Sequence, residues 1–121
     1  MLDKPTLLFV FAHPDDESFS GAGTAMQCAS AGARSVLVTA TRGEQGKTGD
    51  PPLCTREELP ACRERELRHA AGIIGFDELH LFDYHDKELP NAPPEIIQDI
   101  QMLRIEKWIG CVNQNAAVPW R

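Results

Sequence analysis

The sequence predicts a three-layer α/β fold with a mainly parallel sheet, and three observations support this. Residues 6–12 form a continuous apolar run without polar alternation, which is typical of a strand buried on both faces. Residues 35–41 form a second apolar run that is rich in β-branched residues. Segments with helical spacing follow each run. This alternation indicates parallel strands joined by right-handed helical crossovers.

The first crossover helix is expected over residues 18–33. This segment holds small residues and helix formers, and Gly32 is placed to stop the helix. After the second strand, residues 42–52 contain three glycines and two prolines, so we expect a loop there.

The second helix is expected to begin near Thr55 and to end near residue 74. Thr55 is a suitable N-cap, and Glu58 three positions later completes a capping box. Gly75 is placed to end the helix. The charged run at residues 63–66 is interpreted as its solvated face.

The last third of the chain predicts one more strand and one more helix. Residues 78–83 alternate with a period of two, which indicates a third strand, and residues 84–94 are expected to form a loop. An apolar stripe over residues 95–108 favours a third helix. Residues 110–121 have no strong periodicity.

Composition limits the class of protein. A chain of 121 residues is one domain at most, and 42% hydrophobic with 25% charged residues is typical of a globular chain. The net charge of -6 argues against nucleic-acid binding. No apolar run reaches membrane-spanning length and no signal pattern is present, so we expect a cytoplasmic protein. The four cysteines form no Cys-x-x-Cys and are expected to be free thiols. Composition does not predict the oligomeric state.

The chemistry is expected where the first strand ends, at His13-Pro14-Asp15-Asp16-Glu17. His13 and Asp16 are three positions apart in a turn restricted by Pro14, so an imidazole nitrogen and a carboxylate oxygen can point at one centre. Both groups are common zinc ligands. A catalytic zinc needs three protein ligands and an open position for water. Asp15 lies between the two candidate ligands and is placed to act as a general base.

Two other interpretations of this segment are open. An acidic turn after a strand is often only a helix N-terminus, where carboxylates interact favourably with the helix dipole. A nucleotide-binding loop is a third interpretation, but an acidic loop repels phosphate and no Gly-x-Gly-x-x-Gly follows the strand.

Ala12 to Glu17 after an apolar strand resembles the signature of the LmbE/PIG-L family of zinc-dependent N-deacetylases, which act on N-acetylglucosaminyl compounds. The resemblance continues through residues 38–44, the helix around residues 63–67 and the strand at residues 79–83, and covers about residues 5–100. It implies a Rossmann-like sandwich that hydrolyses the amide of a small N-acetylated sugar conjugate.

By that resemblance His13 and Asp16 are zinc ligands, Asp15 is the general base, and Glu17 packs or hydrogen-bonds next to them. Arg42 and Glu44 are candidates for contacts with sugar hydroxyls, with a solvated loop as the alternative.

The resemblance breaks in the C-terminal part. The family's third ligand is a histidine in a His-Pro-Asp-His-type segment, and no histidine follows His85 here. His85 is the best candidate for a substitute ligand and a candidate substrate contact, although an ordinary exposed loop histidine is the favoured interpretation. We expect residues 1–101 to be the N-terminal part of a deacetylase domain and residues 102–121 to be a divergent tail, as a truncated or shifted reading frame would give. The chain is then a deacetylase that is either active through a substitute ligand or inactive without its third ligand, and the alternative is a non-catalytic binding remnant.

Overall fold

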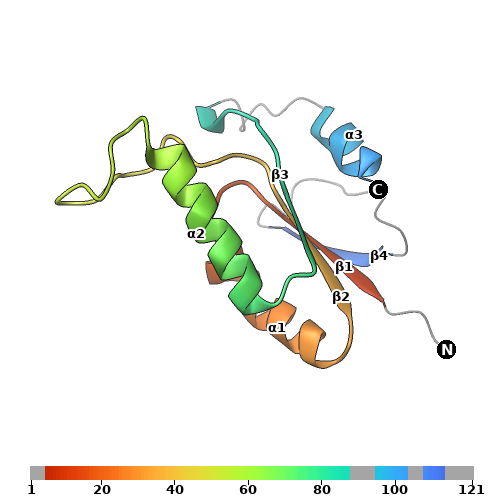
Figure 1. The fold of residues 1–121 in the computed structure, drawn as a ribbon. Helices are drawn as coiled ribbons and strands as arrows, with labels where there is room; N and C mark the ends of the chain where they lie inside the picture. Colours follow the sequence, from red (N-terminus) through yellow and green to blue (C-terminus); the bar gives the residue numbers. More distant parts are fainter. Residues whose placement is uncertain (1–4, 88–94, 104–107, 114–121) are drawn as a thin grey trace.

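The computed structural model describes residues 5–87, 95–103 and 108–113, and these form a parallel sheet with helices on both faces (Figure 1). In chain order the elements are β1 (Thr6–Phe11), a wide helical turn η1 (Glu17–Gly21), α1 (Ala22–Ser30), β2 (Arg34–Thr39), α2 (Leu59–Ile74), β3 (Glu78–Leu81), α3 (Glu95–Met102) and β4 (Trp108–Asn113). The four described strands lie in the order β3-β2-β1-β4, and each neighbouring pair is parallel. The predicted three-layer α/β fold with a mainly parallel sheet is confirmed.

The pleat of β1 divides the core into two layers. Phe9 and Phe11 are buried on the side of α1 and α2, with Leu67 of α2 among their neighbours. Leu8 and Val10 are buried on the opposite side, in a cluster with Ile100 of α3. Full burial of such a side chain stabilises a fold by roughly 1.5–3 kcal/mol, so the continuous apolar run holds both helical layers.

The start of α2 depends on a capping box that lies one turn earlier than the regular helix. The Glu58 backbone N–H donates to Thr55 Oγ1 at 3.1 Å, and the Thr55 N–H donates to Glu58 Oε2 at 3.1 Å. The predicted capping box is therefore confirmed, but it closes an isolated turn and the helix begins at Leu59. At the other end Gly75 has φ +100°, a left-handed conformation that favours glycine.

The C-terminal part differs most from expectation. The helix predicted to reach residue 108 ends at Met102, and β4 follows where no strand is predicted. β4 pairs with β1, with Gly110 opposite Leu7. Gly110 and Asn113 have low β-propensity, so the sequence of this segment does not indicate a strand. The strand forms through its backbone pairing with β1. The third strand ends at Leu81. Residues 104–107 and 114–121, which make up most of the predicted tail, lie outside the described residues, so the boundary at residue 101 stays a prediction.

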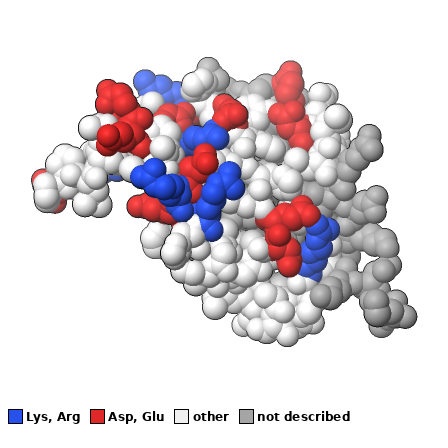
Figure 2. All heavy atoms as spheres, viewed as in Figure 1, with Lys and Arg blue, Asp and Glu red and all other residues white. Residues whose placement is uncertain are grey.

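Acidic and basic side chains lie next to one another on the face shown in Figure 2, over the region of α2 and the loop before it. This view shows no extended area of a single sign. In the part of the chain that the structure describes, no helix combines the length and apolar character needed to cross a bilayer.

Candidate active site

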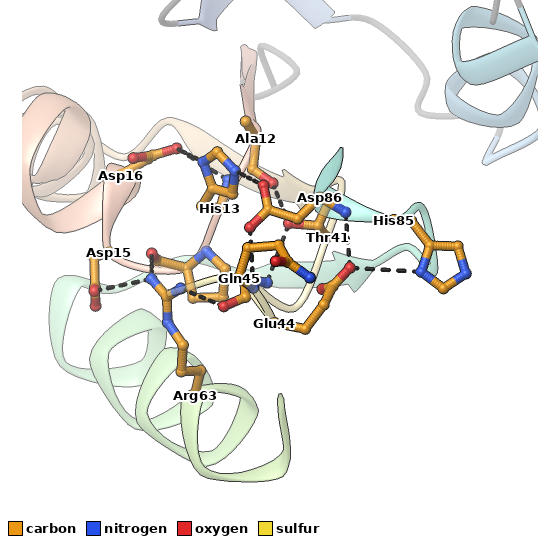
Figure 3. Close-up of polar contacts among 12 residues, drawn as sticks. Ala12, His13, Asp15, Asp16, Thr41, Glu44, Gln45, Arg63, His85 and Asp86 are labelled. Atoms are coloured by element: carbon orange, nitrogen blue, oxygen red, sulfur yellow. Dashed lines mark hydrogen bonds and ion pairs between the residues drawn. The ribbon is translucent and has the colours of Figure 1, made fainter. Parts of the chain in front are cut away.

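Three loops meet at the carboxyl edge of the sheet, following β1, β2 and β3 (Figure 3). Backbone hydrogen bonds hold them together: the Thr41 N–H donates to the Ala12 carbonyl at 3.0 Å, and the Tyr84 N–H donates to the Ala40 carbonyl at 3.1 Å. The carboxyl ends of parallel strands are where ligands bind in such sheets. The predicted meeting of the three polar loops is confirmed.

His13 and Asp16 lie side by side at this edge. His13 Nδ1 is 3.7 Å from Asp16 Oδ2, and the same carboxylate oxygen accepts the His13 backbone N–H at 2.9 Å. The other ring nitrogen, Nε2, contacts Asp86 Oδ1 (Figure 3). One nitrogen of the ring therefore contacts the Asp86 carboxylate, and the other faces the Asp16 carboxylate.

Asp15 points towards α2 and away from Asp16 (Figure 3). Its φ of +90° is in the left-handed region, which is unusual for a residue other than glycine. Two contacts hold this conformation. The Asp15 backbone N–H donates to Glu17 Oε2 at 3.1 Å, and Arg63 Nη2 donates to Asp15 Oδ2 at 3.2 Å. The Asp15 side chain stays 56% exposed.

Glu17 is the acidic residue of the segment that is buried, with 1% of its surface exposed. Burial raises the pKa of its carboxyl group, and the Glu17 backbone and Ser18 hydroxyl hydrogen bonds oppose that shift. Because Glu17 also accepts the Asp15 backbone N–H, its buried carboxylate restrains the backbone of the loop after β1. This agrees with the expectation that Glu17 packs and hydrogen-bonds next to the site residues.

Arg63 joins the loops after β1 and β2 to α2. Its Nη1 donates to the Gly43 carbonyl at 2.8 Å and its Nη2 to the Pro14 carbonyl at 2.7 Å, with 16% of the side chain exposed. A Cβ on Gly43, which has φ +68°, would lie 1.9 Å from Arg63 Nη1, and one on Gly46 would lie 2.7 Å away. The two glycines therefore make room for the guanidinium.

The interpretation of Arg63 as part of a solvated face is wrong. Within its charged run, nothing in the sequence distinguishes Arg63 from Arg65. The available signal was the Gly43-x-x-Gly46 spacing in the preceding loop, because closely spaced glycines often mark a close approach of other atoms.

Asp86 is a second residue that the sequence analysis did not single out. Besides its contact with His13, its Oδ2 accepts the Gln45 N–H at 3.3 Å, and its own N–H donates to Glu44 Oε1 at 2.7 Å. Asp86 thus connects the loops that follow all three of the strands β1, β2 and β3. Its place after the third strand was the only signal in the sequence.

The predicted substrate contacts are engaged with other residues of this chain. Arg42 Nε donates to Glu64 Oε1 at 3.0 Å, and Arg42 also contacts Asp83. The hydrogen bond from Arg42 is the main reason that the pKa of Glu64 is lowered. Glu44 lies next to His85, whose Nδ1 is 3.6 Å from Glu44 Oε1.

His85 is not brought to the pair formed by His13 and Asp16. Its side chain is 75% exposed and lies on the far side of Glu44 (Figure 3). Over residues 5–87, 95–103 and 108–113, no group of three His, Cys, Asp or Glu side chains is arranged to hold a metal ion. In this arrangement His85 does not complete a group of three ligands with His13 and Asp16, which agrees with the alternative that it is an exposed loop histidine.

The donor chemistry of His13 and Asp16 fits two corners of a zinc site. Two ligands at about 2.0–2.2 Å from one ion, in tetrahedral geometry, lie roughly 3.3–3.6 Å apart. The observed separation of 3.7 Å is close to that spacing. A catalytic zinc needs three protein ligands, and around this pair the described residues form no group of three His, Cys, Asp or Glu side chains.

Comparison with known proteins identifies the family of this chain. The sequence profile of the PIG-L family, described as GlcNAc-PI de-N-acetylase, matches residues 8–109. A probable N-acetyl-alpha-D-glucosaminyl L-malate deacetylase 2 from Bacillus anthracis is 41% identical over 103 residues, which are 84% of this chain and 46% of the relative. A 1D-myo-inositol 2-acetamido-2-deoxy-alpha-D-glucopyranoside deacetylase from Segniliparus rotundus is 41% identical over 60% of this chain and 25% of its own length.

A solved structure of similar fold agrees with the match to the PIG-L family profile. The N,N'-diacetylchitobiose deacetylase from Pyrococcus horikoshii superimposes with a TM-score of 0.80 at 28% identity, over 98% of this chain and 44% of that one. The chain spans about half the length, or less, of these relatives. With a profile match over residues 8–109 and the shared fold, the chain belongs to the PIG-L family of GlcNAc-PI de-N-acetylases.

Proposed function

We propose that the protein acts as a zinc-dependent N-deacetylase on a small N-acetylglucosaminyl conjugate, with His13 and Asp16 as two of its zinc ligands. The family and the relatives' names support the reaction class. Within the described part of the chain, no third metal-ligating side chain joins these two. The cytoplasmic location expected from the sequence stays a prediction.

The observation that carries the proposal is the environment of the His13 ring. A metal-binding histidine commonly donates its second ring N–H to a carboxylate, which fixes its tautomer and orientation. Asp86 occupies that position on Nε2, which leaves Nδ1 as the free donor atom, and Nδ1 faces Asp16 at 3.7 Å. A histidine with a purely structural role does not need this arrangement of two carboxylates around one ring.

Each residue then has a distinct task. A bound zinc ion would supply a water of lowered pKa and would polarise the amide carbonyl. Asp15 is the candidate general base for the attacking water, and this role requires its side chain to turn from α2 towards His13 and Asp16. Arg63 holds the Asp15 carboxylate from the side of α2 at 3.2 Å, and Glu17 holds its backbone at 3.1 Å. Arg42, Glu44 and His85 lie on the adjacent loops as candidate contacts for sugar hydroxyls.

A non-catalytic binding module is the second candidate. The observation that favours it is that the described residues contain no group of three metal-ligating side chains. Such a module keeps the sugar-binding rim but does not hydrolyse the amide.

The test is zinc binding measured by calorimetric titration of the purified chain. His13→Ala and Asp16→Ala should abolish binding, and Asp86→Asn should weaken it by about 10–100-fold through the orientation of the ring. His69→Ala, on the exposed face of α2, is the matched control and should bind as the wild type does. Equal affinity of wild type, H13A and D16A would refute the assignment of the ligands.

Acetate release from an N-acetylglucosaminyl malate conjugate separates the two candidates. The deacetylase releases acetate in a zinc-dependent manner, and this release is lost in Asp15→Asn. Binding of the conjugate without any release of acetate, in a chain that binds zinc, favours the binding module.

A further inference from the structure

Two cysteines line a hollow next to the candidate active site. The hollow has a volume of about 440 Å³, and its lining includes Asp15, Lys47, Cys54, Leu59 and Cys62. Cys54 is in the loop before α2, and Cys62 is in the first turns of that helix. Both cysteines are free and only partly buried, so a small reagent that enters the hollow can reach both sulfurs.

The surroundings of the two sulfurs differ in a way that suits sequential reaction. Burial, followed by the neighbouring Cys62 thiol, raises the pKa of the Cys54 thiol, and the carboxylates of Glu58 and Glu66 act in the same direction. Arg65 Nη2 donates to Cys62 Sγ at 3.3 Å, so a cation lies against the second sulfur. The thiolate is the attacking form of a cysteine.

We infer that Cys54 and Cys62 form a reversible dithiol–disulfide pair that fastens the loop before α2 to the helix next to Asp15. The inference rests on the shared hollow and does not depend on the proposed deacetylase activity. The oxidant is a low-molecular-weight disulfide, the class of reagent that exchanges with protein thiols.

The exchange balances without any further reagent. Cys62, as a thiolate, attacks one sulfur of the small disulfide, which forms a mixed disulfide and releases one small thiolate. Cys54 loses its proton and attacks the Cys62 sulfur, which releases the second small thiolate. Two cysteine thiols become one disulfide, one small disulfide is reduced to two thiols, and the two protons end on the released thiols.

The disulfide has a local structural consequence. It closes a ring over positions 54–62 and so fixes the C-terminal end of the loop that carries Lys47, which lines the same hollow. A cross-link reduces the freedom of the opened loop, so local opening becomes rarer. The space next to Asp15 is then reached less easily.

Peptide mapping tests the pair directly, because trypsin cuts between the two cysteines. Cleavage after Lys47, Arg56 and Arg63 gives the peptides 48–56 and 57–63, each with one cysteine. The chain is incubated with glutathione disulfide and digested without reduction. The expected product is the two peptides joined, two hydrogens lighter than their sum, and dithiothreitol should separate them.

Variants and native proteolysis complete the test. Cys54→Ser should leave a glutathione adduct on Cys62, whereas Cys28→Ser, which changes the partly buried thiol of α1, should leave the joined product unchanged. Oxidation should slow native cleavage after Lys47 roughly tenfold in the wild type but not in Cys62→Ser. The inference is overturned if peptides 48–56 and 57–63 carry separate glutathione adducts in the wild type, or if either cysteine pairs with one outside this set.

Discussion

Replacement of Arg63 by lysine should destabilise the chain although the charge and helix propensity are kept. The planar guanidinium reaches two backbone carbonyls on different loops, at 2.7 and 2.8 Å. A lysine ammonium has no such fork and can satisfy only one of them. The loss of one charge-assisted hydrogen bond in a side chain that is 16% exposed costs about 2 kcal/mol. The ion pair with the exposed Asp15 carboxylate adds about 0–1 kcal/mol.

Thermal unfolding followed by circular dichroism measures this effect. At roughly 4 °C per kcal/mol for a chain of this size, Tm should fall by about 8 °C. Arg65→Lys is the matched control two positions along the same helix. Arg65 is exposed and donates to Cys62 Sγ, so its replacement should change the free energy of unfolding by less than about 0.5 kcal/mol. If the two variants unfold at the same temperature, the role of Arg63 as a clamp between loops is wrong.

Three further predictions use denaturant unfolding. Gly43→Ala should destabilise the chain by about 2 kcal/mol, because Gly43 has a φ of +68° and a Cβ there overlaps the Arg63 guanidinium. Gly72→Ala is the control: a Cβ at this helical position meets no atom within 4 Å, so the variant should be more stable by about 0.5–1 kcal/mol. Phe9→Ala should cost about 3–5 kcal/mol and Phe19→Ala, at a side chain that is 88% exposed, less than about 0.5 kcal/mol; equal losses would contradict the described core. Folding raises the pKa of Glu17 above 4.5, so the free energy of unfolding should fall as pH rises from 4.5 through the raised pKa. The Glu17→Gln variant should not show this fall. If the variant and the wild type have parallel pH profiles, this carboxyl group is not the cause.

The strands that build the rim could be predicted because their signals are local. The apolar run of β1 is buried on both faces, and side-chain burial is what produces such a run. The capping box at Thr55 and Glu58 is likewise a contact within one turn. β4 gives no comparable signal, because its pairing with β1 depends on backbone groups from a distant part of the chain.

In the candidate site, too, local contacts could be predicted from the sequence and long-range contacts could not. His13 and Asp16 are three positions apart, so their proximity follows from the sequence. Asp86 and Arg63 reach the site only through the arrangement of the loops and α2 around the sheet, at separations of 73 and 49 positions from their partners His13 and Pro14. Contacts of this kind require the folded chain to be known.

The left-handed backbone of Asp15 means that stability and chemistry favour different residues at that position. Such a conformation costs a non-glycine residue on the order of 1–3 kcal/mol, and glycine would adopt it freely. Selection for thermodynamic stability alone would therefore replace this aspartate with glycine. That change would remove the carboxylate from the carboxyl edge of the sheet. Under the proposed role of Asp15 as general base, keeping an acid there is a trade-off, because the fold becomes less resistant to unfolding while the proton acceptor remains in place.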